Sequence, residues 1–439
     1  MANCKAVLTI LGIQNAKWTD DGRPIVDNHA HQARYYFEEE KTVEKYYSTL
    51  PLLIDRYANE YEIVPIYTKD AKYFNEDLLS KEGKQCKFDD HVSLIEENEY
   101  FEIFKKIDML VDKYDETIVD LTHGFRHIPI LAIIDLVIQN FKKTNKIEKI
   151  LFAKEIIKHT KKSQGEYEIV DLKGYLDIAN ISFVLSSFEN NYTISNHIKT
   201  ADKDFQELIN MLSRFSEHIM ANSLINLFKG QNSLVEKILN AIESIKKHEK
   251  ISPLLTKLEA FQEHLKLFVD LKEKREDIQL FELAKLVNKK GYYLNAITLL
   301  DEAIGWYCAH SLCQYSIDFK EIFKKQIDNY SYKITSNAKN IIKFTFDSRE
   351  YHNELGVKDS SEIQETLKNI KDCEKFSRNL IVEVANNRND LAHANNQKKL
   401  NDVKNMLEKL FGRFQTYCID KDILRKKESS IDDLKAFFA

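Results

Sequence analysis

The amino-acid sequence predicts an α/β portion at the N-terminus followed by an all-α remainder. Strand-like and helix-like segments alternate over residues 1–175, and strand-like segments almost vanish after that point. The 439 residues include only 11 glycines and 5 prolines, which favours helices over an all-β fold. Strands separated by helices imply a mostly parallel sheet that is covered on both faces.

Short apolar segments between polar turns are the predicted strands. They are residues 4–12, 33–37, 62–68, 116–124, 146–156 and 166–172. Segments with helical apolar spacing lie between them, at residues 40–57, 100–114 and 128–143.

Helical periodicity continues from about residue 175 to the end of the sequence, interrupted by the charged segment 270–279. We therefore expect an α/β domain over residues 1–175, a helical connecting region over 176–275 and a helical domain over 276–439.

The composition excludes several classes of protein. A net charge of -5 gives no basic surface of the kind that binds duplex DNA. The six cysteines are scattered and form no disulfide framework, which fits a reducing cytoplasm. No run of about 18 apolar residues occurs, so we expect no membrane span.

The stretch DLTHGFRHIP, residues 120–129, lies between a predicted strand and a predicted helix. Ligands of open parallel sheets bind beyond the carboxyl ends of the strands. Gly124 permits backbone conformations that other residues avoid. The helix that follows would direct free N–H groups and its positive dipole end at a ligand. Thr122, Arg126 and the two histidines add donors, so this stretch indicates a site for a phosphorylated or otherwise anionic ligand.

The turn at Gly12 ends the first predicted strand and should lie at the same edge of the sheet. Neither a G-x-G-x-x-G fingerprint nor a phosphate-binding loop that ends in Lys-Ser/Thr is present. An alternative interpretation stays open, in which His123 and Arg126 only cap their turn and pair with Asp120.

A second stretch, NNRNDLAHA at residues 386–394, lies within a predicted helix. Asn389 and His393 are four residues apart and would share a face, with Arg388 beside it. A histidine can transfer protons near neutral pH, and an arginine can hold a scissile phosphate. Acid–base cleavage usually needs both an acid and a base, and this stretch has one histidine. A symmetric dimer would supply two. The spacing alone also fits a surface helix with an incidental Arg and His.

Both stretches resemble motifs of known families. DLTHGFRHIP resembles the ligand-binding signature of CARF domains, the Rossmann-like sensors of CRISPR systems. NNRNDLAHA resembles the R-x4-6-H motif of HEPN ribonucleases, and KKGYYLNAITLLDEAI resembles the early helix of that domain. In this order they make nearly the whole chain similar to the CARF–HEPN accessory ribonucleases of type III CRISPR systems, although residues 180–275 contribute only generic helices.

The resemblance implies an N-terminal CARF domain, a helical connecting region and a C-terminal HEPN domain. It implies a cytoplasmic homodimer that is activated by a cyclic oligoadenylate, the tetra- or hexa-adenylate. The implied reaction is metal-independent cleavage of single-stranded RNA, with the 2′-hydroxyl as nucleophile, a 2′,3′-cyclic phosphate as product and no further cofactor.

Carried onto this sequence, the resemblance implies the catalytic residues Arg388, Asn389 and His393 and no metal ligands. The implied ligand-binding residues are Gly12, Ile13, Gln14, Thr122, His123, Gly124, Arg126 and His127. Many relatives read Gly-Thr-Gly at the first turn, where this chain has Gly-Ile-Gln. No hydroxyl contact is therefore carried over to that turn.

Two other functions are compatible with the resemblance. The first is a sensor whose HEPN portion is an inactive binding module, although the intact Arg388, Asn389 and His393 argue against it. The second is a ribonuclease that limits its own signal by degrading the activator, with Thr122, His123 and Arg126 positioning the ligand's 2′-hydroxyl. The sequence does not decide the second.

Overall fold

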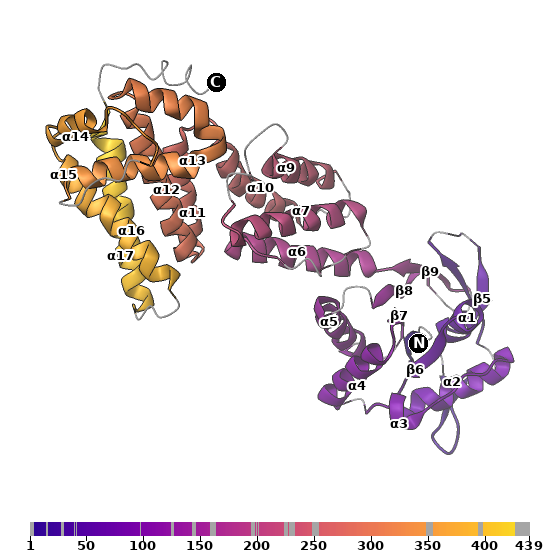
Figure 1. Ribbon diagram of the computed structural model, residues 1–439. Coiled ribbons are helices and arrows are strands. Elements are labelled where there is room, and N and C mark those ends of the chain that lie inside the picture. Colours follow the sequence, from indigo (N-terminus) through magenta and orange to yellow (C-terminus); the bar gives the residue numbers. More distant parts are fainter. Residues whose placement is uncertain are drawn as a thin grey trace. The chain divides into compact units, whose positions relative to one another are not determined.

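The computed structural model divides into two compact units, each built from several stretches of the chain (Figure 1). The first unit comprises Met1–Phe188, Ile194–Ser213 and Ala241–Glu259. The second comprises Glu189–Thr193, Arg214–Asn240 and Ala260–Ala439. The structure describes the chain apart from residues 1–3, 15, 28–29, 39, 41, 97, 124–126, 143–145, 159–163, 195–197, 199, 201, 224–226, 228–232, 248–253, 348–353, 394–397 and 426–439.

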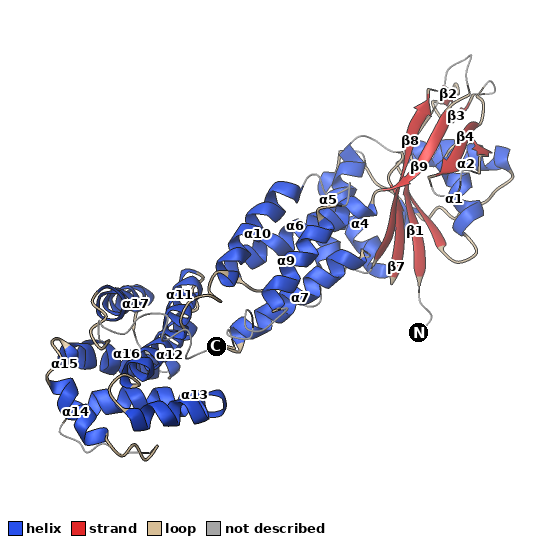
Figure 2. Cartoon of the chain, turned by 90° about the horizontal axis from the view of Figure 1, so that it is seen from above, coloured by secondary structure: helices blue, strands red, loops and turns tan. Residues whose placement is uncertain are grey.

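The first unit contains a seven-stranded sheet with the order β5-β4-β9-β8-β7-β1-β6, whose strands are drawn in red in Figure 2. Its strands are β1 (Lys5–Ile10), β4 (Ala33–Phe37), β5 (Glu44–Tyr46), β6 (Glu62–Ile66), β7 (Glu116–Asp120), β8 (Ile147–Ile157) and β9 (Glu166–Asp171). A separate hairpin is formed by β2 (Ala16–Trp18) and β3 (Pro24–Val26).

The sheet is mixed but mostly parallel, as predicted. The neighbouring strands β8, β7, β1 and β6 all run parallel, so their carboxyl ends lie along one edge. Antiparallel pairs join β8 to β9 and β4 to β5, whereas β4 and β9 pair in parallel. All six predicted strands are present, and this confirms the α/β class of the N-terminal portion.

Helices cover both faces of the sheet. They are α1 (Thr49–Tyr57), α2 (Lys69–Glu82), α3 (Asp90–Ser93), α4 (Tyr100–Lys113) and α5 (His127–Lys142). Leu8 of β1 belongs to a core that includes Ile107 of α4. Its neighbour Val7 belongs to a second core that includes Leu52 of α1. Successive side chains of a strand point to opposite faces, so one apolar strand supplies both cores.

One predicted helix is wrong in its first half. Residues 40–57 have helical apolar spacing, but Glu44–Tyr46 forms β5 and the helix begins only at Thr49. β5 pairs antiparallel with β4 at the edge of the sheet, and this tertiary pairing outweighs the local helical pattern. Sequence patterning also missed α2 and the β2–β3 hairpin.

The rest of the described chain is helical. Its helices are α6 (Lys173–Asn191), α7 (Lys203–Met220), α9 (Leu234–Ile245), α10 (Leu255–Val269), α11 (Glu276–Lys289), α12 (Tyr293–Leu312), α13 (Ile317–Thr345), α14 (Ser360–Lys368), α15 (Cys373–Phe376), α16 (Glu383–Ala392) and α17 (Leu400–Phe414), with π-helical turns η2 (Ser377–Val382) and η3 (Gln415–Asp420). No strand follows Asp171 among the described residues, which confirms the all-α class of this portion. None of the described helices is long and apolar enough to cross a membrane.

Helices α12 and α13 cross closely in the second unit. A Cβ atom added to Gly305 of α12 would lie 2.9 Å from the Cβ of Thr335 of α13. One turn away on each helix, Lys339 forms an ion pair with the buried carboxylate of Asp301, with 2.7 Å between Nζ and Oδ1. Glycine at this crossing therefore lets the two helices approach closely enough for the ion pair to form.

We predict that Gly305→Ala lowers the free energy of unfolding by about 1–3 kcal/mol, because the added methyl group overpacks the crossing. Gly412→Ala in α17 is the matched control, since a Cβ there meets no atom within 4 Å. This control should raise the free energy of unfolding by up to about 1 kcal/mol, because alanine favours a helix interior. Urea unfolding followed by circular dichroism tests both, and equal stability of the two variants would contradict the prediction.

Candidate functional site

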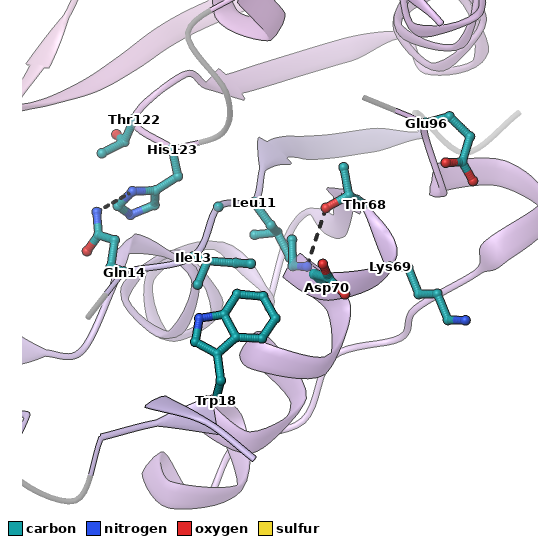
Figure 3. Close-up of a pocket in the computed structure, with 12 residues that line it drawn as sticks. Leu11, Ile13, Gln14, Trp18, Thr68, Lys69, Asp70, Glu96, Thr122 and His123 are labelled. Carbon is teal, nitrogen blue, oxygen red and sulfur yellow. Dashed lines mark hydrogen bonds between the residues drawn. The ribbon is translucent and has the colours of Figure 1, made fainter. Parts of the chain in front are cut away.

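A cavity of about 650 Å³ lies at the carboxyl ends of β7, β1 and β6 in the first unit. Its walls come from the turns after β1 and β7 and from the start of α2, with single residues from the hairpin and from the segment after α3 (Figure 3). The lining residues are Leu11, Gly12, Ile13, Gln14, Trp18, Thr68, Lys69, Asp70, Ala71, Glu96, Thr122 and His123.

The buried carboxylate of Asp120 organises the strand ends beside this cavity. Thr9 of β1 and Thr49 of α1 donate their hydroxyls to Oδ2 at 2.8 and 2.9 Å. Thr122 donates to Oδ1 from its hydroxyl at 2.6 Å and from its backbone N–H at 3.1 Å. Thr9 lies opposite Asp120 in the parallel register of β1 and β7. These four donors stabilise a carboxylate that is only 1% exposed.

The hydroxyl of Thr122 also accepts a hydrogen bond from the backbone N–H of Ala153 in β8, at 2.9 Å. This hydroxyl therefore has a partner on each side and connects the end of β7 to the neighbouring strand. The geometry supports a role for Thr122 in shaping the turn, and its role as a ligand contact stays a prediction.

His123 is buried between the turn after β1 and the start of α1. Its Nδ1 lies 2.8 Å from the side-chain amide of Gln14, and the backbone N–H of Thr49 lies 3.5 Å from its Nε2 (Figure 3). Burial lowers the pKa of His123 below its ordinary value of 6.5, although nearby Asp120 opposes this shift. The ring is therefore neutral at pH 7 and presents one donor and one acceptor rather than a positive charge.

The structure brings five of the eight predicted ligand-binding residues to one cavity. These are Gly12, Ile13, Gln14, Thr122 and His123.

Of the other three predicted ligand-binding residues, the structure describes only His127. His127 begins α5, and its ring packs edge-on against Tyr100 of α4, with 5.0 Å between the ring centroids. Gly124 and Arg126 lie outside the described residues. The alternative in which Arg126 only caps the turn is therefore not tested.

Sequence analysis missed the wall that α2 forms. Thr68 caps this helix through a hydrogen bond from the backbone N–H of Ala71, at 3.4 Å, and Lys69 and Asp70 follow in the first turn. β6 ends just before this segment and runs parallel to β1, so its carboxyl end lies at the same edge of the sheet. Ligands of parallel sheets bind at that edge, and the segment after β6 could therefore have been predicted to line the site. No comparable sequence pattern predicted that Trp18 lines the cavity, because its strand β2 is only three residues long.

In the second unit, Arg388 of α16 is held by a buried acid of α12. Its Nη1 lies 2.7 Å from Oδ2 of Asp301, whose other carboxylate oxygen pairs with Lys339. The side chain of Asp301 is 3% exposed and that of Arg388 is 28% exposed. Arg388 also donates a long hydrogen bond, 3.4 Å, to the amide oxygen of Asn389. The charge-assisted hydrogen bond to Asp301 thus holds the guanidinium of Arg388 in place and leaves part of it exposed.

The predicted helical position of His393 is wrong. Helix α16 ends at Ala392, and His393 has extended backbone angles, φ -88° and ψ 126°. Lys398 donates to Asn387 at 2.7 Å and to Asp390 at 2.9 Å, so its side chain lies against the end of α16. Asn389 and His393 therefore do not share a helix face. His393 is exposed and follows Arg388 by five residues in the sequence.

We predict that the neutral His123 makes the fold less stable as the pH falls. The unfolded chain takes up a proton near pH 6.5, whereas the buried ring resists it, so stability is unaffected above that pH and falls below it. The loss levels off once the ring is protonated in the folded state. Thermal unfolding would be measured at about pH 7.5 and about pH 5.5, on either side of the ordinary pKa of histidine. The decrease in Tm between these two pH values should be smaller for His123→Gln than for the wild type. Equal decreases would contradict the prediction.

Comparison with known proteins gives a CRISPR-associated relative. The chain is 25% identical over 375 residues to the CRISPR-associated protein MJ1674 of Methanocaldococcus jannaschii. The alignment covers 79% of this chain and 54% of that protein, so the chain spans about half the length of the relative. No family model matches the chain.

A solved structure, Enterococcus italicus Csm6 bound to cyclic hexa-2'-fluoro-hexa-dAMP, matches over 99% of this chain and 97% of its own. The sequence identity is 12% and the TM-score is 0.35. The similarity to MJ1674 confirms the resemblance of the chain to CRISPR-associated proteins, which its signature turn predicts.

Proposed function

We propose that the chain is a ribonuclease of CRISPR defence that a cyclic oligoadenylate activates. The observation that carries this proposal is the cavity at the carboxyl ends of β7, β1 and β6, which the signature residues Thr122 and His123 line together with the turn at Gly12. The ligand would be a cyclic tetra- or hexa-adenylate, as the resemblance to CARF domains implies.

The cavity supports binding of a nucleotide through neutral donors. His123 offers a donor and an acceptor, and the amide of Gln14 beside it offers the same. The turn after β7 leads into α5, and the N-terminus of a helix favours an anionic group. One cavity of about 650 Å³ would take part of the ring, and a second copy of the chain would supply the rest.

The proposed reaction uses Arg388 and His393. The imidazole of His393 would take the proton of the RNA 2′-hydroxyl, whose oxygen then attacks the adjacent phosphorus. The 5′-oxygen of the next nucleotide leaves with a proton, and the product carries a 2′,3′-cyclic phosphate. Arg388 would hold the phosphate and offset its developing charge. His393 of a second copy would supply the acid that protonates the leaving oxygen.

An apolar stripe on α5 supports the proposed homodimer. Ile130, Ile133, Ile134 and Ile138 are 58%, 45%, 47% and 39% exposed, and their spacing places them on one face of the helix. Phe101 of α4 is also exposed. Exposed isoleucines at this spacing are typical of a surface that another protein covers. A second copy would cover this stripe next to the turn that binds the ligand.

The two alternative functions make different demands on the same residues. An inactive HEPN module would not need Arg388 to be fixed by Asp301 and Lys339, and this arrangement therefore favours the enzyme. Degradation of the activator in the first unit would need a hydroxyl or imidazole free to act. Thr122 and His123 both already have hydrogen-bond partners, and this favours binding of the activator over its degradation.

We predict that one ring size triggers cleavage of a fluorescent single-stranded RNA in the presence of EDTA. His393→Ala should lower the rate by about 10²–10⁴-fold, because it removes the proton-transfer group. His91→Ala is the matched control, since His91 is an exposed histidine of the first unit outside both sites. Cleavage would be measured without ligand and with the cyclic tri-, tetra- and hexa-adenylates. A ring that binds without triggering cleavage would reduce the protein to a sensor.

We predict that Ile134→Glu weakens the dimer, because it places a charge in the apolar stripe of α5. Ile317→Glu is the matched control, since Ile317 of α13 is 79% exposed in the second unit. Light scattering during size-exclusion chromatography should give a smaller mass for Ile134→Glu than for the wild type and the control. An unchanged mass of two chains for Ile134→Glu would show that the dimer forms through another surface.

A further inference from the structure

The hairpin of β2 and β3 holds an exposed tryptophan at the cavity. Trp18 pairs with Pro24 across the hairpin, and the connecting turn closes through a hydrogen bond from Thr19 N–H to Arg23 C=O, at 2.9 Å. Gly22 in this turn has φ +77°, a conformation that a larger residue would adopt only with strain. The hairpin is thus a short but well-defined support for the indole ring.

The hairpin is fixed to α2 by polar and apolar contacts. The backbone N–H of Val26 donates to Asp77 at 2.9 Å, and Lys81 donates to the backbone carbonyl of Val26 at 2.7 Å. The side chain of Val26 packs against Phe74. The guanidinium of Arg23 lies over the ring of Tyr73, 4.9 Å from its centroid. The hairpin and α2 therefore form one rigid wall.

Trp18 is 55% exposed, yet it lines the cavity. In Figure 3 its indole extends from the hairpin toward Ile13 and Asp70. A half-exposed indole leaves much apolar surface in water, and a flat ligand that covered it would gain free energy. The exposure of Trp18 therefore marks this end of the cavity as a place for a planar group.

The charged residue next to Trp18 indicates which part of a nucleotide would lie there. Asp70, Glu96 and Lys69 all line the cavity, and Figure 3 shows Asp70 near the indole and Glu96 farther away. The carboxylate of Asp70 opposes a phosphate but accepts hydrogen bonds from the exocyclic amine of a purine base. The opposite end of the cavity, at His123 and the turn after β7, holds the neutral donors. The cavity is therefore divided into a base end and a phosphate or ribose end.

We propose that Trp18 is a base-stacking residue that binds one adenine of the ligand on its indole face. This inference rests on the proposed function, because it takes the ligand to be a cyclic oligoadenylate. The stacking would select rings whose adenine reaches the hairpin while the rest of the nucleotide lies at the strand ends. Trp18 would thus contribute to the choice of ring size.

Intrinsic fluorescence tests this proposal directly, because the chain has only two tryptophans. Trp306→Phe removes the other one, which lies in α12 of the second unit, and leaves Trp18 as the single reporter. Titration of the full-length variant with cyclic tetra- and hexa-adenylate should quench its emission. Trp306→Phe should bind the ring as tightly as the wild type.

The affinity of two further variants completes the experiment. Calorimetry should show that Trp18→Leu weakens binding of the ring by roughly 5- to 150-fold, the range expected when one base–aromatic stack is lost. Trp18→Phe should retain most of the affinity, because a smaller aromatic face remains. If a ring binds the wild type but neither quenches Trp18 nor distinguishes Trp18→Leu, the inference is wrong and the proposed function stands. If no ring binds the wild type, both are wrong.

Discussion

The buried carboxylate of Asp120 is the interaction on which the first unit depends. A carboxylate inside a protein is stable only when donors surround it, and here the hydroxyls of Thr9, Thr49 and Thr122 do so. These threonines belong to β1, to α1 and to the turn after β7, so one anion joins three elements that are distant in the sequence. The same contacts fix the turn at which His123 lies, and the shape of the cavity follows from that turn.

The second unit uses the same principle. Asp301 of α12 is almost completely buried and pairs with Lys339 of α13 and Arg388 of α16. The close crossing at Gly305 brings α12 and α13 together, and this permits the ion pair with Lys339. Without its two cations the buried charge of Asp301 would be uncompensated, at a cost of about 3–5 kcal/mol. In each unit, therefore, a buried acid positions the groups that would face a phosphate.

The two candidate sites also differ in how they can recognise an anion. The cavity of the first unit has the neutral imidazole of His123 and the amide of Gln14 on one side and Asp70 next to Trp18 on the other. This arrangement suits a ligand that is part base and part phosphate. In the second unit the permanently charged guanidinium of Arg388 is partly exposed, and His393, which follows it by five residues, is exposed. A fixed positive charge of this kind suits a phosphodiester rather than a base.

The sequence by itself determined the α/β and all-α portions, six strands of the sheet and the turn after Asp120, because alternating apolar segments and local turn residues act over short distances. It did not determine β5, the wall formed by α2 or the partners of Arg388. β5 is a strand only because β4 lies beside it, and Asp301 reaches Arg388 across 87 positions of the chain. Helix α16 likewise ends at Ala392, and Lys398 forms hydrogen bonds with Asn387 and Asp390 of its last turns. These features depend on long-range pairs of side chains and strands, which only the tertiary structure brings together, whereas local periodicity describes each segment alone.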